Sequence, residues 1–126
     1  MPVRTELRLR VPNSPGALRD VVHALAVGGV GVLALSLEPT GELRLIVDHV
    51  SRAEGLLRER HRTVTAHDVL VVTTASDRHA VPAALALIAD AGVNVDYAYT
   101  ANHGPGGGML VLGVVEPLRV ATATGT

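Results

Sequence analysis

The residues best suited to chemistry form one turn between a strand-like and a helix-like segment: Asn13, Ser14, Pro15, Gly16, Ala17 and Leu18. We expect Ser14 to cap a helix and Pro15 to take its first position, where a missing N–H costs nothing. Gly16 lets another backbone or a ligand come close. The first N–H groups of a helix have no intrahelical acceptor and lie at the positive end of its dipole, so they can hold a carboxylate. The same pattern also fits an ordinary hydrated strand-to-helix turn.

No catalytic or metal-binding pattern accompanies this turn in the sequence. The chain has no cysteine, which excludes disulfides, thiol nucleophiles and zinc-thiolate sites. Its six histidines share no compact ligand spacing. The glycine-rich run before Met109 lacks the Lys-Ser/Thr pair of a phosphate loop, and no Gly-x-Ser-x-Gly motif occurs. We therefore expect no metal, no cofactor and no enzymatic activity.

Composition is typical of a small α/β or α+β protein with an aliphatic core. The 126 residues are 48% hydrophobic, yet they include no Phe or Trp and only two Tyr. Eleven basic and 12 acidic residues leave a formal net charge of −1 and no basic block for nucleic acid. The start lacks the apolar core of a signal peptide, and the apolar run at 24–37 is shorter than the ~20 residues of a membrane span. We expect a cytoplasmic protein that binds neither nucleic acid nor membrane.

Hydrophobic periodicity predicts the order β-α-β-β-α-β in residues 1–66. Charged and aliphatic side chains alternate along residues 6–11, as in a strand with one buried face. This order is the ferredoxin-like, split βαβ arrangement. The expected elements are strands at 6–11, 30–37, 42–47 and 63–65, a helix from Ser14 to a stop at Gly28, and a helix capped by Ser51 that ends near Arg60.

The pattern then starts again in residues 67–126. An offset of 63 residues (70 minus 7) aligns a strand, a helix and the start of a second strand with the first copy, as in Leu70 on Leu7 and Gly92 on Gly29. Because the residue before Pro82 is pushed away from helical geometry, we expect the helix of this copy to start late. The expected elements are strands at 68–74, from 93 onward and at 109–115, and a helix at 82–91.

The second copy is truncated, because the residues after Pro117 are too few for a full helix and a final strand. We therefore predict an α+β protein of two ferredoxin-like repeats, 1–66 and 67–126. A single copy near 60 residues rarely supplies a sufficient core, so the two should pack as an intramolecular pseudo-dimer. Each copy should form an antiparallel sheet with its helices on one face.

Three stretches of the chain resemble ACT domains: the turn from Asn13 to Leu18, the strand entry Gly29-Val30-Gly31-Val32, and Ala91-Gly92-Val93-Asn94-Val95 in the second copy. The resemblance covers nearly the whole chain as two tandem copies, and is closest to short stand-alone ACT proteins without a catalytic domain. It implies a non-catalytic regulatory or sensor protein. It also implies an amino acid or related small metabolite bound between adjacent copies, near the first turn and a neighbouring second strand.

The resemblance further implies a role for each part of this site. Asn13 would orient the ligand, the N–H groups from Gly16 to Leu18 would hold its carboxylate, and a facing strand from either copy would line the other side. The candidate ligand-binding residues are Asn13, Ser14, Pro15, Gly16, Ala17, Leu18, Leu33, Ala34, Leu35, Ser36, Asp96, Tyr97, Ala98 and Tyr99. The run Ser76-Asp77-Arg78-His79 stands where the turn should recur, so we expect the first turn to dominate binding.

The strand at 30–37 predicts self-association. It is largely apolar on both faces, whereas helices can cover only one face of the sheet, and an uncovered apolar face or edge seeks a partner. We therefore expect a homo-oligomer, with a homodimer as the simplest case. The alternative function is a structural or protein-interaction module of the same fold that binds no ligand.

Overall fold

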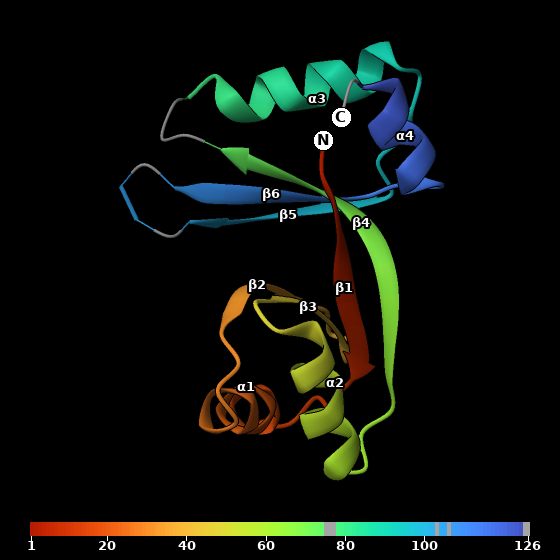
Figure 1. The fold of residues 1–126 in the computed structure, drawn as a ribbon. Helices are drawn as coiled ribbons and strands as arrows, with labels where there is room; N and C mark the ends of the chain where they lie inside the picture. Colours follow the sequence, from red (N-terminus) through yellow and green to blue (C-terminus); the bar gives the residue numbers. More distant parts are fainter. Residues whose placement is uncertain (75–77, 103, 106, 125–126) are drawn as a thin grey trace. The chain divides into compact units, whose positions relative to one another are not determined.

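The computed structural model describes residues 1–74, 78–102, 104–105 and 107–124, which belong to two compact units. The first unit is Thr5–His67, and the second unit combines Met1–Arg4 with Asp68–Thr126. The fold is α+β (Figure 1). The described residues form β1 (Val3–Arg10), α1 (Ala17–Val27), β2 (Val32–Leu37), β3 (Glu42–Val47), α2 (Val50–Glu59), β4 (Val64–Thr74), α3 (Ala80–Asp90), β5 (Tyr97–Asn102), β6 (Gly108–Gly113) and α4 (Pro117–Ala123).

The first unit has the predicted β-α-β-β-α-β order. Its strands lie in the order β2-β3-β1-β4, and β3 pairs antiparallel with both β1 and β2. Leu7 lies opposite Leu45, and Leu9 lies opposite Leu43, so β1 and β3 present their leucines on one face. This arrangement confirms the ferredoxin-like prediction for the first copy.

Helices α1 and α2 cover that leucine face. Since side chains alternate along a strand, every second residue of β1 and β3 points toward the helices. A fully buried leucine contributes about 1.5–3 kcal/mol relative to an exposed one. The core of the first unit includes Leu7, Leu9, Leu43, Leu45 and Val47 from the strands, and Val21, Leu25, Ala53 and Leu57 from the helices.

The alternate residues of the same strands carry charges. Glu6 is fully buried, and its Oε1 lies 2.8 Å from Nε of Arg8 and 4.0 Å from Nε of Arg44. Arg44 also lies 2.5 Å from Glu38 and 3.3 Å from Glu42. Charged groups that leave water need such partners, because an uncompensated buried charge is strongly destabilising.

The second unit repeats this plan with one strand taken from the start of the chain. β6 pairs antiparallel with β4 and with β5, and α3 and α4 pack on a separate aliphatic core. The Val71 N–H donates to the Pro2 carbonyl at 2.9 Å, while Met1 and Val3 pack against that core. In this unit the N-terminal residues therefore lie beside β4, as β4 lies beside β1 in the first unit.

Some predicted element boundaries are wrong. Residues 63–65 and 68–74 do not form two strands, because β4 runs without a break from Val64 to Thr74. The helix of the second copy does not start late: α3 begins at Ala80, the counterpart of Ala17. Pro82 is tolerated because it lies in the first turn, where its missing N–H would have no intrahelical acceptor.

The remaining differences are shifts of a few residues. The N-cap of α2 is His49, so Ser51 lies inside the first turn and makes no cap. The strand expected from residue 93 begins at Tyr97. The residues after Glu116 form the seven-residue helix α4. Among the described residues, no helix is both long and apolar enough to cross a membrane.

Removal of Met1–Arg4 should destabilise the second unit selectively, because these residues contribute the Pro2 carbonyl and the packing of Val3. One lost backbone hydrogen bond and the lost apolar burial suggest a cost of about 1–3 kcal/mol. Native-state hydrogen exchange should show reduced protection at the Val71 amide. The Val11 amide, which donates to Gly41 in the first unit, is the internal control. Unchanged protection at Val71 would contradict this assignment of residues 1–4.

Candidate functional site

The predicted turn is a tight bend that ends before α1 begins. The Ala17 N–H donates to the Ser14 carbonyl at 3.2 Å, and Gly16 has φ of 82° and ψ of −7°. With Pro15 before it, this is the geometry of a type II turn, in which the third residue needs a positive φ. The prediction that Ser14 caps the helix and Pro15 starts it is therefore wrong: α1 starts at Ala17, and Gly16 is its N-cap.

A cavity of about 330 Å³ lies against this turn, within the first unit. Five of the predicted residues line it, and five further residues that the sequence did not indicate complete it. The predicted ones are Asn13, Ser14, Gly16, Ala17 and Leu18; the others are Pro12, Arg19, Leu37, Glu38 and Gly41.

The pairing of β3 with β1 brings the second set of lining residues to the turn. Arg10 lies opposite Glu42, so the loop between β2 and β3 arrives where β1 ends. There the Val11 N–H donates to the Gly41 carbonyl, and Arg10 Nη1 donates to the Thr40 carbonyl, both at 2.8 Å. The loop is thus held at the end of β1, next to the Asn13–Leu18 turn, by one backbone and one side-chain hydrogen bond.

Both signs of charge are available around the cavity. Arg44 Nη1 donates a hydrogen bond to Oε1 of Glu38 at 2.5 Å. Because the Arg44 side chain is only 10% exposed, this hydrogen bond holds the Glu38 carboxylate in place. The exposed Arg19 guanidinium lies 3.5 Å from Asp20. The N–H groups of Leu18 and Arg19 belong to the first turn of α1, where no intrahelical acceptor exists. The cavity therefore offers acceptors for an ammonium group and donors for a carboxylate.

The other predicted residues lie elsewhere in the structure. Pro15 is exposed and does not line the cavity, and β2 contributes its last residue, Leu37, in place of Leu33, Ala34, Leu35 or Ser36. In the second unit, Asp96 precedes β5, and Ala98 lies between Tyr97 and Tyr99, whose rings stack with centroids 6.4 Å apart. A ligand contact by the 96–99 strand stays a prediction.

The place equivalent to the turn in the second unit holds a smaller cavity, of about 210 Å³. Thr74 and Val81 line it on one side, and residues of β5 and β6 line it on the other. Ser76 and Asp77 of the altered turn lie outside the described residues. Arg78 and His79, which follow them, contact each other at 3.3 Å.

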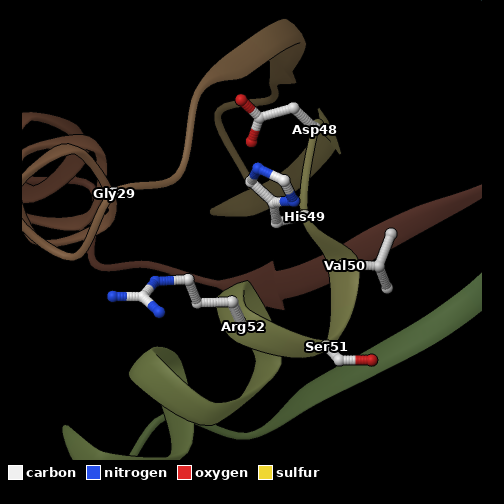
Figure 2. A pocket seen from close by; sticks show the side chains of 6 residues that line it. All are labelled: Gly29, Asp48, His49, Val50, Ser51 and Arg52. Atoms are coloured by element: carbon white, nitrogen blue, oxygen red, sulfur yellow. The ribbon is translucent and has the colours of Figure 1, made fainter.

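A wider hollow of about 620 Å³ opens at the start of α2 (Figure 2). Its charged side chains already serve the adjoining loop. Asp48 Oδ1 accepts a hydrogen bond from the Gly31 N–H at 2.8 Å, and Arg52 Nε donates to the Gly28 carbonyl. Among the described residues, no group of three or more metal-ligating side chains is placed to hold an ion. The hollow is therefore a weaker candidate than the turn cavity.

Comparison with known proteins identifies the fold. No protein-family model matches the chain, and no curated protein matches it. A protein from Bacteroides thetaiotaomicron superposes with a TM-score of 0.82 at 24% identity, over 96% of this chain and 85% of its own. The regulatory subunits of aspartate kinase from Thermus flavus and Thermus thermophilus superpose with TM-scores of 0.62 and 0.68. Each is 17% identical over 98% of this chain, and the matches cover 90% and 89% of those subunits. The chain shares the α+β, ferredoxin-like fold of these regulatory subunits.

The two glycines that line the turn cavity should differ in their tolerance of a methyl group. A Cβ at Gly16 would meet no atom within 4 Å, so Gly16→Ala should cost only the left-handed backbone strain, about 1–2 kcal/mol. A Cβ at Gly41 would lie 2.4 Å from the Val11 carbonyl oxygen, at a φ of 92°. Gly41→Ala should therefore lower the free energy of unfolding by more than Gly16→Ala does. Urea denaturation followed by circular dichroism measures both values, and equal costs would contradict the geometry of the loop.

Proposed function

We propose that this chain is a non-catalytic regulatory protein that binds a free amino acid, or a closely related small metabolite, in the turn cavity. The observation that carries the proposal is the meeting of the Asn13–Leu18 turn and Glu38 in one cavity of about 330 Å³. This volume is at the small end of the usual range for ligand sites, roughly 300–1,000 Å³. A free amino acid is of a size to match.

The chemistry of the lining favours a zwitterion. The ligand carboxylate would accept hydrogen bonds from the N–H groups of Leu18 and Arg19, with the Asn13 amide beside it. The ligand ammonium would donate to Oε2 of Glu38, whose Oε1 already accepts from Arg44. Arg44 offsets the charge of Glu38 where this carboxylate lies beside the partly apolar wall that includes Leu37.

The comparisons support a regulatory role. Two of the solved structures that share this fold are named as regulatory subunits of aspartate kinase, and the one from Thermus thermophilus is described as a ligand-free form. We extend to this chain the idea of a subunit that responds to a small molecule and acts through a partner. The residues that line the turn cavity support that extension.

A thermal-shift screen of the common amino acids tests the proposal. A ligand that binds only the folded state should raise the melting temperature, because it adds about 2.7 kcal/mol of stability at 100 times its Kd. The N-acetyl form of the hit lacks the ammonium and its methyl ester lacks the carboxylate, so both should bind much more weakly. Asn13→Ala should abolish the shift, whereas His79→Ala, in the altered turn of the second unit, should retain most of it.

Two results would count against this site. A hit that survives Asn13→Ala and is lost in His79→Ala would place binding in the second unit. If no amino acid shifts the melting temperature, the structural or interaction module becomes the better interpretation. That alternative has its own support in β2, where Leu35 and Leu37 are 39% and 42% exposed.

We also propose that the chain forms a homodimer through β2. Within the first unit β2 pairs only with β3, so its other edge has open backbone groups beside these exposed leucines. Light scattering at tens of micromolar should therefore report twice the 13.1 kDa chain mass. Leu35→Glu should shift the mass to that of one chain, and Val27→Glu, at an exposed position in α1, should leave it unchanged. A single-chain mass for the unmodified protein would refute the dimer.

A further inference from the structure

A cavity of about 440 Å³ opens in the second unit, between the end of α3 and the start of α4. Its wall is largely aliphatic. Val120, which belongs to the core of this unit, and Val93, which packs against that core, line the cavity, while Val115 and Ala123 extend the apolar surface outward. An apolar cavity of this size with a few polar groups is the usual form of a small-molecule site.

The polar side chains of this cavity carry an excess of negative charge. Asp96 and Glu116 are acidic, and Arg119 is the one basic residue among the described lining residues. The Asn94 amide donates to Oδ1 of Asp96 at 3.1 Å, and Arg119 lies 3.3 Å from Oε2 of Glu116. Each carboxylate therefore has a second oxygen, Oδ2 and Oε1 respectively, that can accept a hydrogen bond from a ligand.

The backbone at Glu116 is strained. Its φ of 54° and ψ of 62° are left-handed values that a residue with a side chain rarely adopts, and they cost about 1–3 kcal/mol. Burial does not explain this strain, because the Glu116 side chain is 64% exposed. The strained residue is the N-cap of α4 and lines the cavity.

The equivalent place in the first unit, beside the loop after α1, has different contacts. There, Asp48 and Arg52 bind the loop after α1, and a Cβ at Gly29, the counterpart of Gly92, would lie 3.5 Å from Arg52 Nε. In the second unit, a Cβ at Gly92 would meet no atom within 4 Å. The space beside the loop after α3 is therefore open in the second unit. Among the described residues, no charged side chain of this cavity makes a hydrogen bond to the backbone of that loop.

We propose that this cavity binds a small amphipathic ammonium compound. The apolar body of the ligand packs against Val93 and Val120, and its ammonium group donates to Asp96 Oδ2 and Glu116 Oε1. Binding follows from the net negative lining together with the aliphatic wall. A neutral molecule would lack the attraction to the negative lining, and an inorganic cation would lack the apolar contact with the wall. This site is separate from the turn cavity, which lies in the first unit.

The test uses the full chain and phenethylammonium as the probe, followed by amide chemical shifts in NMR spectra. Its matched ligands are 2-phenylethanol, which lacks the charge, and 3-phenylpropionate, which reverses it. Phenethylammonium should move the amides of residues 91–96 and 115–123 with a Kd of about 1 mM or below, and the other two should bind at least tenfold more weakly. Equal binding of 2-phenylethanol, or no shift at about 10 mM phenethylammonium, would overturn the proposal.

Three variants separate charge from shape. Asp96→Asn keeps the side-chain shape and should weaken phenethylammonium about tenfold, the usual value of one charge-assisted hydrogen bond. Asp90→Asn removes the same charge from α3 outside the cavity and should leave the Kd within twofold. Ala123→Leu should reduce binding of all three ligands by filling the cavity.

If circular dichroism shows that Asp96→Asn does not fold, Glu116→Gln takes its place as the charge variant. Unchanged binding by the folded charge variant would refute the assignment.

Discussion

Burial of one aliphatic sheet face under α1 and α2 is the constraint on which the rest of the first unit depends. Because strand side chains alternate, placing Leu7 and Leu45 toward the helices sends Glu6 and Arg44 to the opposite face. Those charges then need partners, and Arg44 takes Glu38 as one of them. The carboxylate that lines the turn cavity is therefore positioned by the same alternation that builds the core.

The sequence predicted the features that repeat locally. Alternation in β1, helical spacing in α1 and the offset between copies are visible in windows of a few residues. Glu38 and Gly41 escaped prediction because they reach the turn only through the register of β3 against β1. The sequence did show the loop itself, in Pro39-Thr40-Gly41, and the split βαβ order places such a loop beside the end of the first strand. Reasoning from topology could have found them.

Other errors came from residues whose local sequence pattern fits two different backbone structures. Pro15 fits both the first position of a helix and the second position of a type II turn, and Gly16 decides between them by its positive φ. Pro82 is unfavourable in a helix interior but acceptable in the first turn, so its presence did not delay α3. The N-terminal strand of the second unit has no local signature, because alternation does not reveal which strand a segment pairs with.

β4 runs without a break and contributes residues to both cores. Val64 packs in the core of the first unit and Leu70 in that of the second, six residues later (70 minus 64), which is a whole number of strand periods. One residue inserted near His67 would turn one of these side chains out of its core. Ordinary domain boundaries tolerate insertions because they fall in exposed linkers. The interior of a strand lacks this tolerance, so changes in chain length should accumulate in the loops and not within β4.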